Sequence, residues 1–449
     1  MPSRQFQFVI AAIGAAFIAA VYLPDLGAGF VKDDCLWVVT AAGTLHHPAA
    51  LFTVDSSGFF FRPLVTASFA LDYVLHGVNA RGYGLTNLAL CIGCVAAIVM
   101  LFRELGASAA AAAVGALAWA VNPHGIGMAL LWISGRTSLL MTLCSVFSIL
   151  AFLRGQRVIG AVLLLCAMCA KEDAIAVPVL AFACAYAAGR AGTRELPGLM
   201  MSAAWMTAAE AVYFALRMRT SAMTPATAPW YYQLLTSPWH IAINGLSYLD
   251  RAATGAAVIV CVAAVVYGAR PVLTSRARRG LAVAALWFAA GLAITVRIPV
   301  RSDLYAVFPS IGAALACAIA SDAFRGGSRN AAAGDRILAG ALAALLLLVP
   351  VYWTRDARFT EPALLSARMQ HTLTTDLATL PDRGMVVLQD EATRFGTFGD
   401  AFDGMATSAL QLFTGRPFTA EIVTPEDQAV RPGEAARYRL SQGRIERIR

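Results

Sequence analysis

Long apolar runs are the feature that most restricts what this chain of 449 residues can fold into. Hydrophobic residues make up 59% of the chain and charged residues 14%, and the mean hydropathy is +0.65. Soluble proteins are about 45–50% apolar and about 25% charged, so this composition argues against a water-soluble globule, a disordered chain and a coiled coil. The sequence therefore predicts an integral membrane protein.

The apolar runs are long enough, with tilt and some short spans, to cross a bilayer as helices. We predict about eleven transmembrane helices in an all-α polytopic domain over residues 1–353. The predicted spans are 6–24, 84–102, 107–121, 137–153, 158–170, 174–188, 198–216, 252–268, 281–296, 305–321 and 337–353.

Arginine in alternate connections between the spans predicts the orientation. Basic residues concentrate in cytoplasmic loops, which places the N-terminus inside and the C-terminus outside. This topology accounts for much of the net charge of +8, so we predict contact with membrane lipids and no nucleic-acid partner. The basic residues on the inner side are Arg4, Arg103, Arg154, Arg157, Arg190, Arg194, Arg270, Arg276, Arg278, Arg279, Arg325, Arg329 and Arg336.

Apolar density falls after residue 353, which predicts a small soluble extracytoplasmic domain over residues 354–449. Within it, Met385–Leu388 has the pattern of a buried strand and 400–414 that of a short helix. Residues 436–448 are typical of a hairpin that turns at Gln442 and Gly443. We expect a small α/β domain.

The first outer loop, over about residues 24–83, is unusually long for a compact protein. Loops of this length are usually functional or contain helices of their own. Apolar and polar residues alternate at helical spacing over 63–78, which predicts an amphipathic helix at the membrane surface.

The chain has two lysines, and each directly precedes two acidic residues: Lys32-Asp33-Asp34 and Lys171-Glu172-Asp173. Both triplets are predicted on the outer face. Carboxylates at a membrane boundary are costly unless they are paired, bind a cation or face an aqueous cavity. Two such triplets on one face indicate a functional site, although ordinary loop charges that close helix ends remain an alternative.

Further polar residues on the outer face are candidates for binding or support. Arg297 and Arg301 flank a short outer loop, and an arginine fork suits phosphate oxygens, although snorkelling at a helix end would also explain either one. Asp72, His76 and His124 are candidates for supporting roles. Glu210 lies within a predicted span, where a bonded structural carboxylate is as good an explanation as a functional one.

Several motifs together resemble the GT-C superfamily of membrane glycosyltransferases that use polyprenyl-phosphate sugars. The closest resemblance is to the membrane half of O-mannosyltransferases that carry tetratricopeptide repeats, and to their bacterial relatives. No such repeats follow here, so a protein acceptor held by them is not implied. The motifs are Phe30-Val31-Lys32-Asp33-Asp34, Phe61-Arg62-Pro63-Leu64, Leu71-Asp72-Tyr73-Val74-Leu75-His76-Gly77, Gly82-Tyr83-Gly84-Leu85-Thr86-Asn87, Ile133-Ser134-Gly135-Arg136-Thr137, Ala170-Lys171-Glu172-Asp173 and Arg301-Ser302-Asp303-Leu304-Tyr305.

The resemblance implies that Asp33 or Asp34 is the catalytic base. It also implies a polyprenyl-phosphate-linked sugar donor and a glycan, lipid or protein acceptor, at the periplasmic face of a bacterial inner membrane. The residues expected to bind the donor phosphate or sugar are Arg62, Lys171, Glu172, Asp173, Arg297 and Arg301.

Two questions stay open from the sequence. Hard carboxylates suit Mg²⁺, Mn²⁺ or Ca²⁺, so a divalent cation at Asp33 and Asp34 is one alternative and no cofactor is the other. A secondary transporter is the rival function. Transporters usually place their sites near the bilayer midplane, with broken helices and repeated halves, and the sequence has neither pattern.

Overall fold

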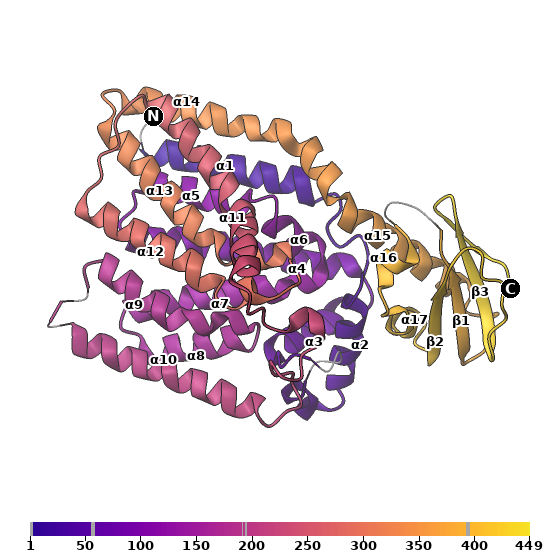
Figure 1. Ribbon diagram of the computed structural model, residues 1–449. Helices are drawn as coiled ribbons and strands as arrows, with labels where there is room; N and C mark the ends of the chain where they lie inside the picture. Colours follow the sequence, from indigo (N-terminus) through magenta and orange to yellow (C-terminus); the bar gives the residue numbers. More distant parts are fainter. Residues whose placement is uncertain (1–2, 55–58, 191, 194, 392–395) are drawn as a thin grey trace. The chain divides into compact units, whose positions relative to one another are not determined.

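The computed structural model describes residues 3–54, 59–190, 192–193, 195–391 and 396–449, which are mostly helical (Figure 1). The helices are α1 (Ser3–Tyr22), α2 (Asp34–Thr44), α3 (Pro63–His76), α4 (Ala80–Glu104), α5 (Ala109–Ala120), α6 (Gly125–Leu131), α7 (Arg136–Leu153), α8 (Arg157–Met168), α9 (Val177–Ala187), α10 (Leu196–Arg217), α11 (Pro238–Tyr267), α12 (Ser275–Gly291), α13 (Ser310–Gly327), α14 (Ala331–Ala343), α15 (Val349–Asp376), α16 (Phe398–Phe402) and α17 (Ala406–Thr414). The strands are β1 (Gly384–Gln389), β2 (Phe418–Val423), β3 (Glu434–Ser441) and β4 (Arg444–Arg447).

Six helical segments in the described part of the chain are long and apolar enough to cross a membrane, or seven if the bent pair α5 and α6 forms one span. They indicate an integral membrane protein. The six segments are Arg4–Tyr22, Ala80–Glu104, Ile133–Leu153, Leu196–Arg217, Pro238–Tyr267 and Ala331–Asp376.

The number of eleven spans is not confirmed by these lengths. Each predicted span overlaps a helix, but α5, α8 and α9 have only 11 or 12 residues. At 1.5 Å per residue such helices are about 18 Å long, against about 30 Å for the hydrocarbon core. Apolar composition alone did not distinguish a short buried helix from a complete span.

The chain divides into two compact units. Unit 1 comprises Met1–Pro24, Ala89–Ala129 and Arg136–Tyr352, and unit 2 comprises Asp25–Leu88, Leu130–Gly135 and Trp353–Arg449. The predicted boundary after residue 353 nearly coincides with one change of unit, but α15 continues through it without a break. Unit 2 also includes the long loop after α1.

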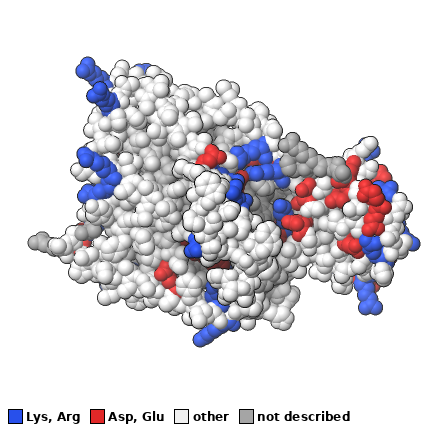
Figure 2. Space-filling view, viewed as in Figure 1, with Lys and Arg blue, Asp and Glu red and all other residues white. Residues whose placement is uncertain are grey.

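Close contacts between helices organise unit 1. Helix α13 packs against α5, α11 and α12, and α8 packs against α7 and α10. A Cβ atom on Gly115 of α5 would lie 2.6 Å from the carbonyl oxygen of Ala314, and one on Gly312 would lie 2.4 Å from that of Ala284. Glycine therefore allows these helix backbones to approach closely, as small residues do in membrane helix packing. Figure 2 shows a largely uncharged surface over these helices.

Unit 2 combines helices of the first loop with a four-stranded sheet of order β2-β1-β3-β4. Strand β1 runs parallel to β2 and β3, while β3 and β4 form an antiparallel hairpin. The buried strand, the hairpin with its turn at Gln442 and Gly443, and a helix over most of 63–78 confirm three predictions.

The helix predicted over 400–414 is divided in two. Asp403 and Gly404 have φ angles of 37° and 73°, and this left-handed backbone ends α16 before α17 begins. Strand β2 was not predicted.

Candidate functional site

The acidic pair of the first loop lies at the start of α2 in unit 2. Lys32 has a φ angle of 53°, its side chain is exposed, and its backbone N–H donates to the carbonyl oxygen of Ala401 at 2.6 Å. Asp33 is the N-cap residue of α2 and Asp34 its first residue. The left-handed turn at Lys32 therefore separates the direction of the lysine side chain from that of the two carboxylates.

Asp34 is fully buried and its two oxygens accept hydrogen bonds from three donors. Oδ1 accepts from the backbone N–H of Ser134 at 2.7 Å and from Ser134 Oγ at 2.5 Å, and Oδ2 accepts from the backbone N–H of Val31 at 2.9 Å. The carboxylate thus connects the start of α2 to the short turn Ile133–Gly135.

Asp33 is half-buried and differs from its neighbour in one respect. Its Oδ1 atom is buried and, among the residues that the structure describes, has no hydrogen-bond partner. Because no donor occupies this oxygen, it can accept a proton.

Burial raises the pKa of both carboxyl groups. It raises the pKa of Asp33 to about 6, against opposing contributions from a Ser134 hydrogen bond and the charge of Arg62. Burial together with the charge of Asp33 raises the pKa of Asp34 to about 7. Because two like charges so close together oppose double ionisation, the pair holds a proton more readily than isolated aspartates do.

The other predicted residues of the first loop lie near the ends of α3. Arg62 directly precedes this helix, and its guanidinium carbon lies 3.8 Å from the centre of the Phe60 ring. Asp72 is buried and accepts a hydrogen bond from Thr86 Oγ1 at 2.8 Å. The His76 ring lies 6.4 Å from that of Tyr83. Asp72 and His76 therefore help to hold α3 against α4.

Lys171 is the centre of a second polar cluster, in unit 1. Its Nζ atom lies 3.0 Å from Asp173 Oδ2, 3.2 Å from Ser138 Oγ and 4.7 Å from the centre of the Tyr305 ring. Glu172 accepts from Arg217 Nη1 at 2.9 Å. Both acids of this triplet thus pair with a cation.

Asp303 joins further residues to this cluster. Its Oδ1 atom lies 2.7 Å from Arg251 Nε and 3.4 Å from His124 Nδ1. Arg251 lies 5.7 Å from the centre of the Tyr248 ring, which lies 6.4 Å from the Tyr305 ring beside Lys171. These contacts connect Asp303 to the cluster around Lys171.

The two predicted outer-loop arginines have different surroundings. Arg301 is exposed, its Nε donates to Asn244 Oδ1 at 2.7 Å, and its charge acts on Tyr248 beside the cluster. Arg297 is exposed too, and its Nε lies 3.5 Å from the carbonyl oxygen of Leu235. Of the two, only Arg301 is joined to the cluster by these contacts.

Sequence reasoning missed the roles of Ser134, Asn244 and Arg251. Arg251 follows Asp250, and α11 contains no other Asp, Glu, Lys or Arg, so this charged pair was a readable signal. Ser134 and Asn244 are ordinary polar residues whose importance depends on partners that are distant in sequence.

The acidic pair does not fit a dedicated Ca²⁺ site, because Asp33 alone keeps an oxygen without a hydrogen-bond donor among the described residues. Asp34 already accepts from N–H and O–H donors, and Ca²⁺ usually takes six to eight oxygen ligands. No group of three or more His, Cys, Asp or Glu side chains suited to a metal ion occurs among the described residues.

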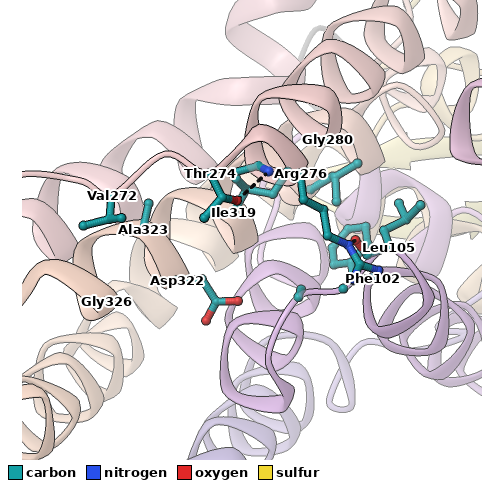
Figure 3. A pocket seen from close by; sticks show the side chains of 14 residues that line it. Phe102, Leu105, Val272, Thr274, Arg276, Gly280, Ile319, Asp322, Ala323 and Gly326 are labelled. Carbon is teal, nitrogen blue, oxygen red and sulfur yellow. Dashed lines mark hydrogen bonds between the residues drawn. The ribbon is translucent and has the colours of Figure 1, made fainter. Parts of the chain in front are cut away.

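A separate cavity of about 230 Å³ lies in unit 1 beside the turn between α4 and α5 (Figure 3). Phe102, Leu105 and Ile319 supply apolar walls. Its charged residues hold the protein backbone: Arg276 donates to the carbonyl oxygen of Leu105, and Asp322 accepts from Ser108 at the start of α5. These charges stabilise helix ends.

No family model matches the chain, and comparisons with curated proteins and with solved structures gave no significant match.

Proposed function

We propose that this protein is an inverting membrane glycosyltransferase of the GT-C type. It transfers one sugar from a polyprenyl-phosphate donor to a lipid-linked glycan, a polysaccharide or a protein. In this proposal about eleven helical segments embed the chain in a bacterial inner membrane, with the active site and C-terminus on the periplasmic side. The observation that carries the proposal is the buried, unbonded Oδ1 atom of Asp33 at the start of α2.

Asp33 is the base in this mechanism and Asp34 a positioning residue. Asp34 has its oxygens occupied by donors from Ser134 and Val31, so it fixes the start of α2. Asp33 keeps one oxygen for the acceptor. This difference supports Asp33 over Asp34 as the base, although the two are equivalent in the sequence.

The reaction needs a base beside the acceptor hydroxyl and positive charge beside the donor phosphate. As the acceptor oxygen bonds to the anomeric carbon, Asp33 takes the hydroxyl proton, and the sugar–phosphate bond breaks with its electron pair on the phosphate. Cationic groups stabilise the charge that develops on this leaving group. The candidate in the same unit as Asp33 is Arg62, whose charge acts on the Asp33 carboxyl group.

The raised pKa of Asp33 suits this role. A base works best when its pKa is near the working pH, and burial brings Asp33 to about 6. We therefore expect transfer to increase with pH through the range in which the pair loses its proton.

The test is transfer of label from a panel of polyprenyl-phosphate sugars to membrane glycans. We expect Asp33→Asn to lower the rate about 10²–10⁴-fold, the usual contribution of a general base. Asp382→Asn is the matched control, since this carboxylate is 98% exposed in the same unit, and it should retain the full rate.

Two results would count against the proposal. Full activity of Asp33→Asn would remove the assigned base. No transfer by the intact wild-type protein from any donor would favour the transporter alternative, for which Glu210 within α10 would be the first residue to examine.

A further inference from the structure

The sheet of unit 2 has two chemically different faces. Side chains alternate along a strand, so residues two apart share a face. Tyr438 contacts a helix on one face, where its hydroxyl donates to Asp376 of α15 at 2.8 Å. The opposite face carries Gln389 of β1 beside its register partner Arg439 of β3, with Arg437 two positions earlier. This second face is polar where a sheet core is usually apolar.

Gln389 is 1% exposed and held in one orientation. Its Nε2 donates to the carbonyl oxygens of Pro425 at 2.5 Å and Asp427 at 3.2 Å. Its Oε1 therefore faces β3, where it accepts from Arg439 Nε at 2.8 Å. The amide thus holds the Nε atom of Arg439 beside β1.

The two arginines of this face differ in how their charge is used. Arg437 is 5% exposed, pairs with both oxygens of Glu434 at 2.9 and 3.0 Å, and donates to the carbonyl oxygen of Asp427. The Asp427 carboxylate in turn pairs with Arg431. For Arg439, the contacts within the described residues use only Nε, so both terminal nitrogens remain for a ligand.

A cavity of about 310 Å³ opens on this face of the sheet, and we call it the sheet-face pocket. Its size is at the lower end of the range for small-molecule sites. It is lined by Gln389, Gln428, Arg437, Arg439, Ile448 and Arg449. Arg439 and Arg449 thus both line one cavity, while the Glu434 and Asp427 carboxylates beside it are paired with Arg437 and Arg431.

The position of the pocket in the sheet supports ligand binding. Gln389 is the last residue of β1, and β1 lies between its parallel neighbours β2 and β3. The chain passes from β1 to β2 on one side and then to β3 on the other. In parallel sheets, ligands bind outside the carboxyl ends of strands where the connections change direction in this way.

We propose that the sheet-face pocket binds the carboxylate or phosphate group of an acidic oligosaccharide. The guanidinium fork of Arg439 matches two oxygens of such a group, and the Gln428 amide suits a sugar hydroxyl. The anionic part of this proposal follows from the pocket alone, while the sugar part rests on the proposed function. In that function the pocket would hold the acceptor glycan.

The experiment measures binding to the full-length protein in nanodiscs at constant ionic strength. The probes are a galacturonate tetramer, a neutral galactose tetramer and inorganic phosphate. We expect the acidic tetramer to bind at least tenfold more tightly than the neutral one. Arg439→Gln should weaken this binding at least tenfold, and Arg439→Lys should weaken it less, because lysine keeps the charge and loses the fork.

Arg444→Gln is the control, because Arg444 is exposed on β4 and does not line the pocket. Equal weakening in Arg439→Gln and Arg444→Gln would overturn the proposal, since it would indicate diffuse electrostatic attraction. Phosphate that binds as tightly as the acidic tetramer would overturn the sugar part. Binding that persists in the transfer-inactive Asp33→Asn protein would separate this site from the catalytic proposal.

Discussion

The two Lys-acid-acid triplets are almost the same in sequence and opposite in structure. In the second, Lys171 pairs with Asp173 at 3.0 Å, and Glu172 pairs with Arg217 at 2.9 Å. In the first, Lys32 is exposed, and the Asp34 carboxylate is held by hydrogen-bond donors from Ser134 and Val31.

The backbone produces this difference. Lys171 is extended, with a φ angle of −163°, and its buried side chain reaches Asp173 two residues later. Lys32 is left-handed, and the chain turns into α2 directly after it. One triplet therefore has both of its acids paired with cations, Lys171 and Arg217. The other leaves a carboxyl pair whose pKa is raised and which can exchange a proton near neutral pH.

Removing each lysine in turn tests this contrast. The loss of Lys171 has the largest expected effect on stability. Lys171→Met leaves Asp173 buried without its cation, and breaking a buried ion pair costs about 3–5 kcal/mol. Lys32→Met removes an exposed charge and should change stability by less than about 0.5 kcal/mol. Thermal unfolding of the purified protein in detergent measures both.

Similar losses in the two variants would contradict the assignment of paired and unpaired triplets. Lys171→Arg serves as a control, because it keeps the positive charge in unit 1. It should recover part of the loss.

Ser134→Ala tests the other triplet. It removes the Oγ donor to Asp34 and keeps the backbone N–H, which should cost about 1–3 kcal/mol in unfolding free energy. Since the Ser134 side-chain hydrogen bond lowers the pKa of both acids, its loss should move the acidic limb of the transfer rate to higher pH.

Ser148→Ala is the matched control for this variant. Ser148 is also buried, but its Oγ donates to the carbonyl oxygen of Gly160 in unit 1. It should lower stability without moving the pH profile. An equal pH shift in both serine variants would remove Ser134 from the site.

The pH dependence of stability should show the acidic pair directly. In the unfolded chain these carboxyls ionise near pH 3.8, whereas the folded pair keeps protons up to about pH 6 to 7. The folded state thus binds more protons in this window, and the unfolding free energy falls as pH rises through it. Asp33→Asn with Asp34→Asn should flatten this part of the profile, measured as the unfolding temperature between pH 5 and 8.

The sequence predicted much of the local structure but not the hydrogen-bond partners of the site residues. Strand β1, the hairpin β3–β4 and helix α3 follow from periodicity and turn residues, which are local signals. It also predicted the acidic pair as the residues of interest. It could not distinguish Asp33 from Asp34, because the difference comes from Ser134, which lies 100 residues away from Asp34.

The remaining differences also depend on long-range packing. Arg297 and Arg301 have equivalent positions around Pro299, yet only Arg301 reaches Asn244 on α11. The number of membrane spans also could not be predicted from composition, because the short helices α8 and α9 are as apolar as helices that cross a bilayer.

Removal of divalent cations should have the smallest effect. In one triplet the acids pair with Lys171 and Arg217, and in the other Asp34 accepts from N–H and O–H groups, so among these acids Asp33 alone keeps an oxygen without a donor in the described residues. One such oxygen is fewer than a dedicated all-protein site for a hard cation takes. Transfer measured with a chelator should therefore stay within about twofold of the untreated rate. If the chelator abolished transfer and added Mg²⁺ or Mn²⁺ restored it, this prediction would be wrong. Asp33 would then be a metal ligand and another group the base, so the two triplets would differ less than their hydrogen bonds indicate.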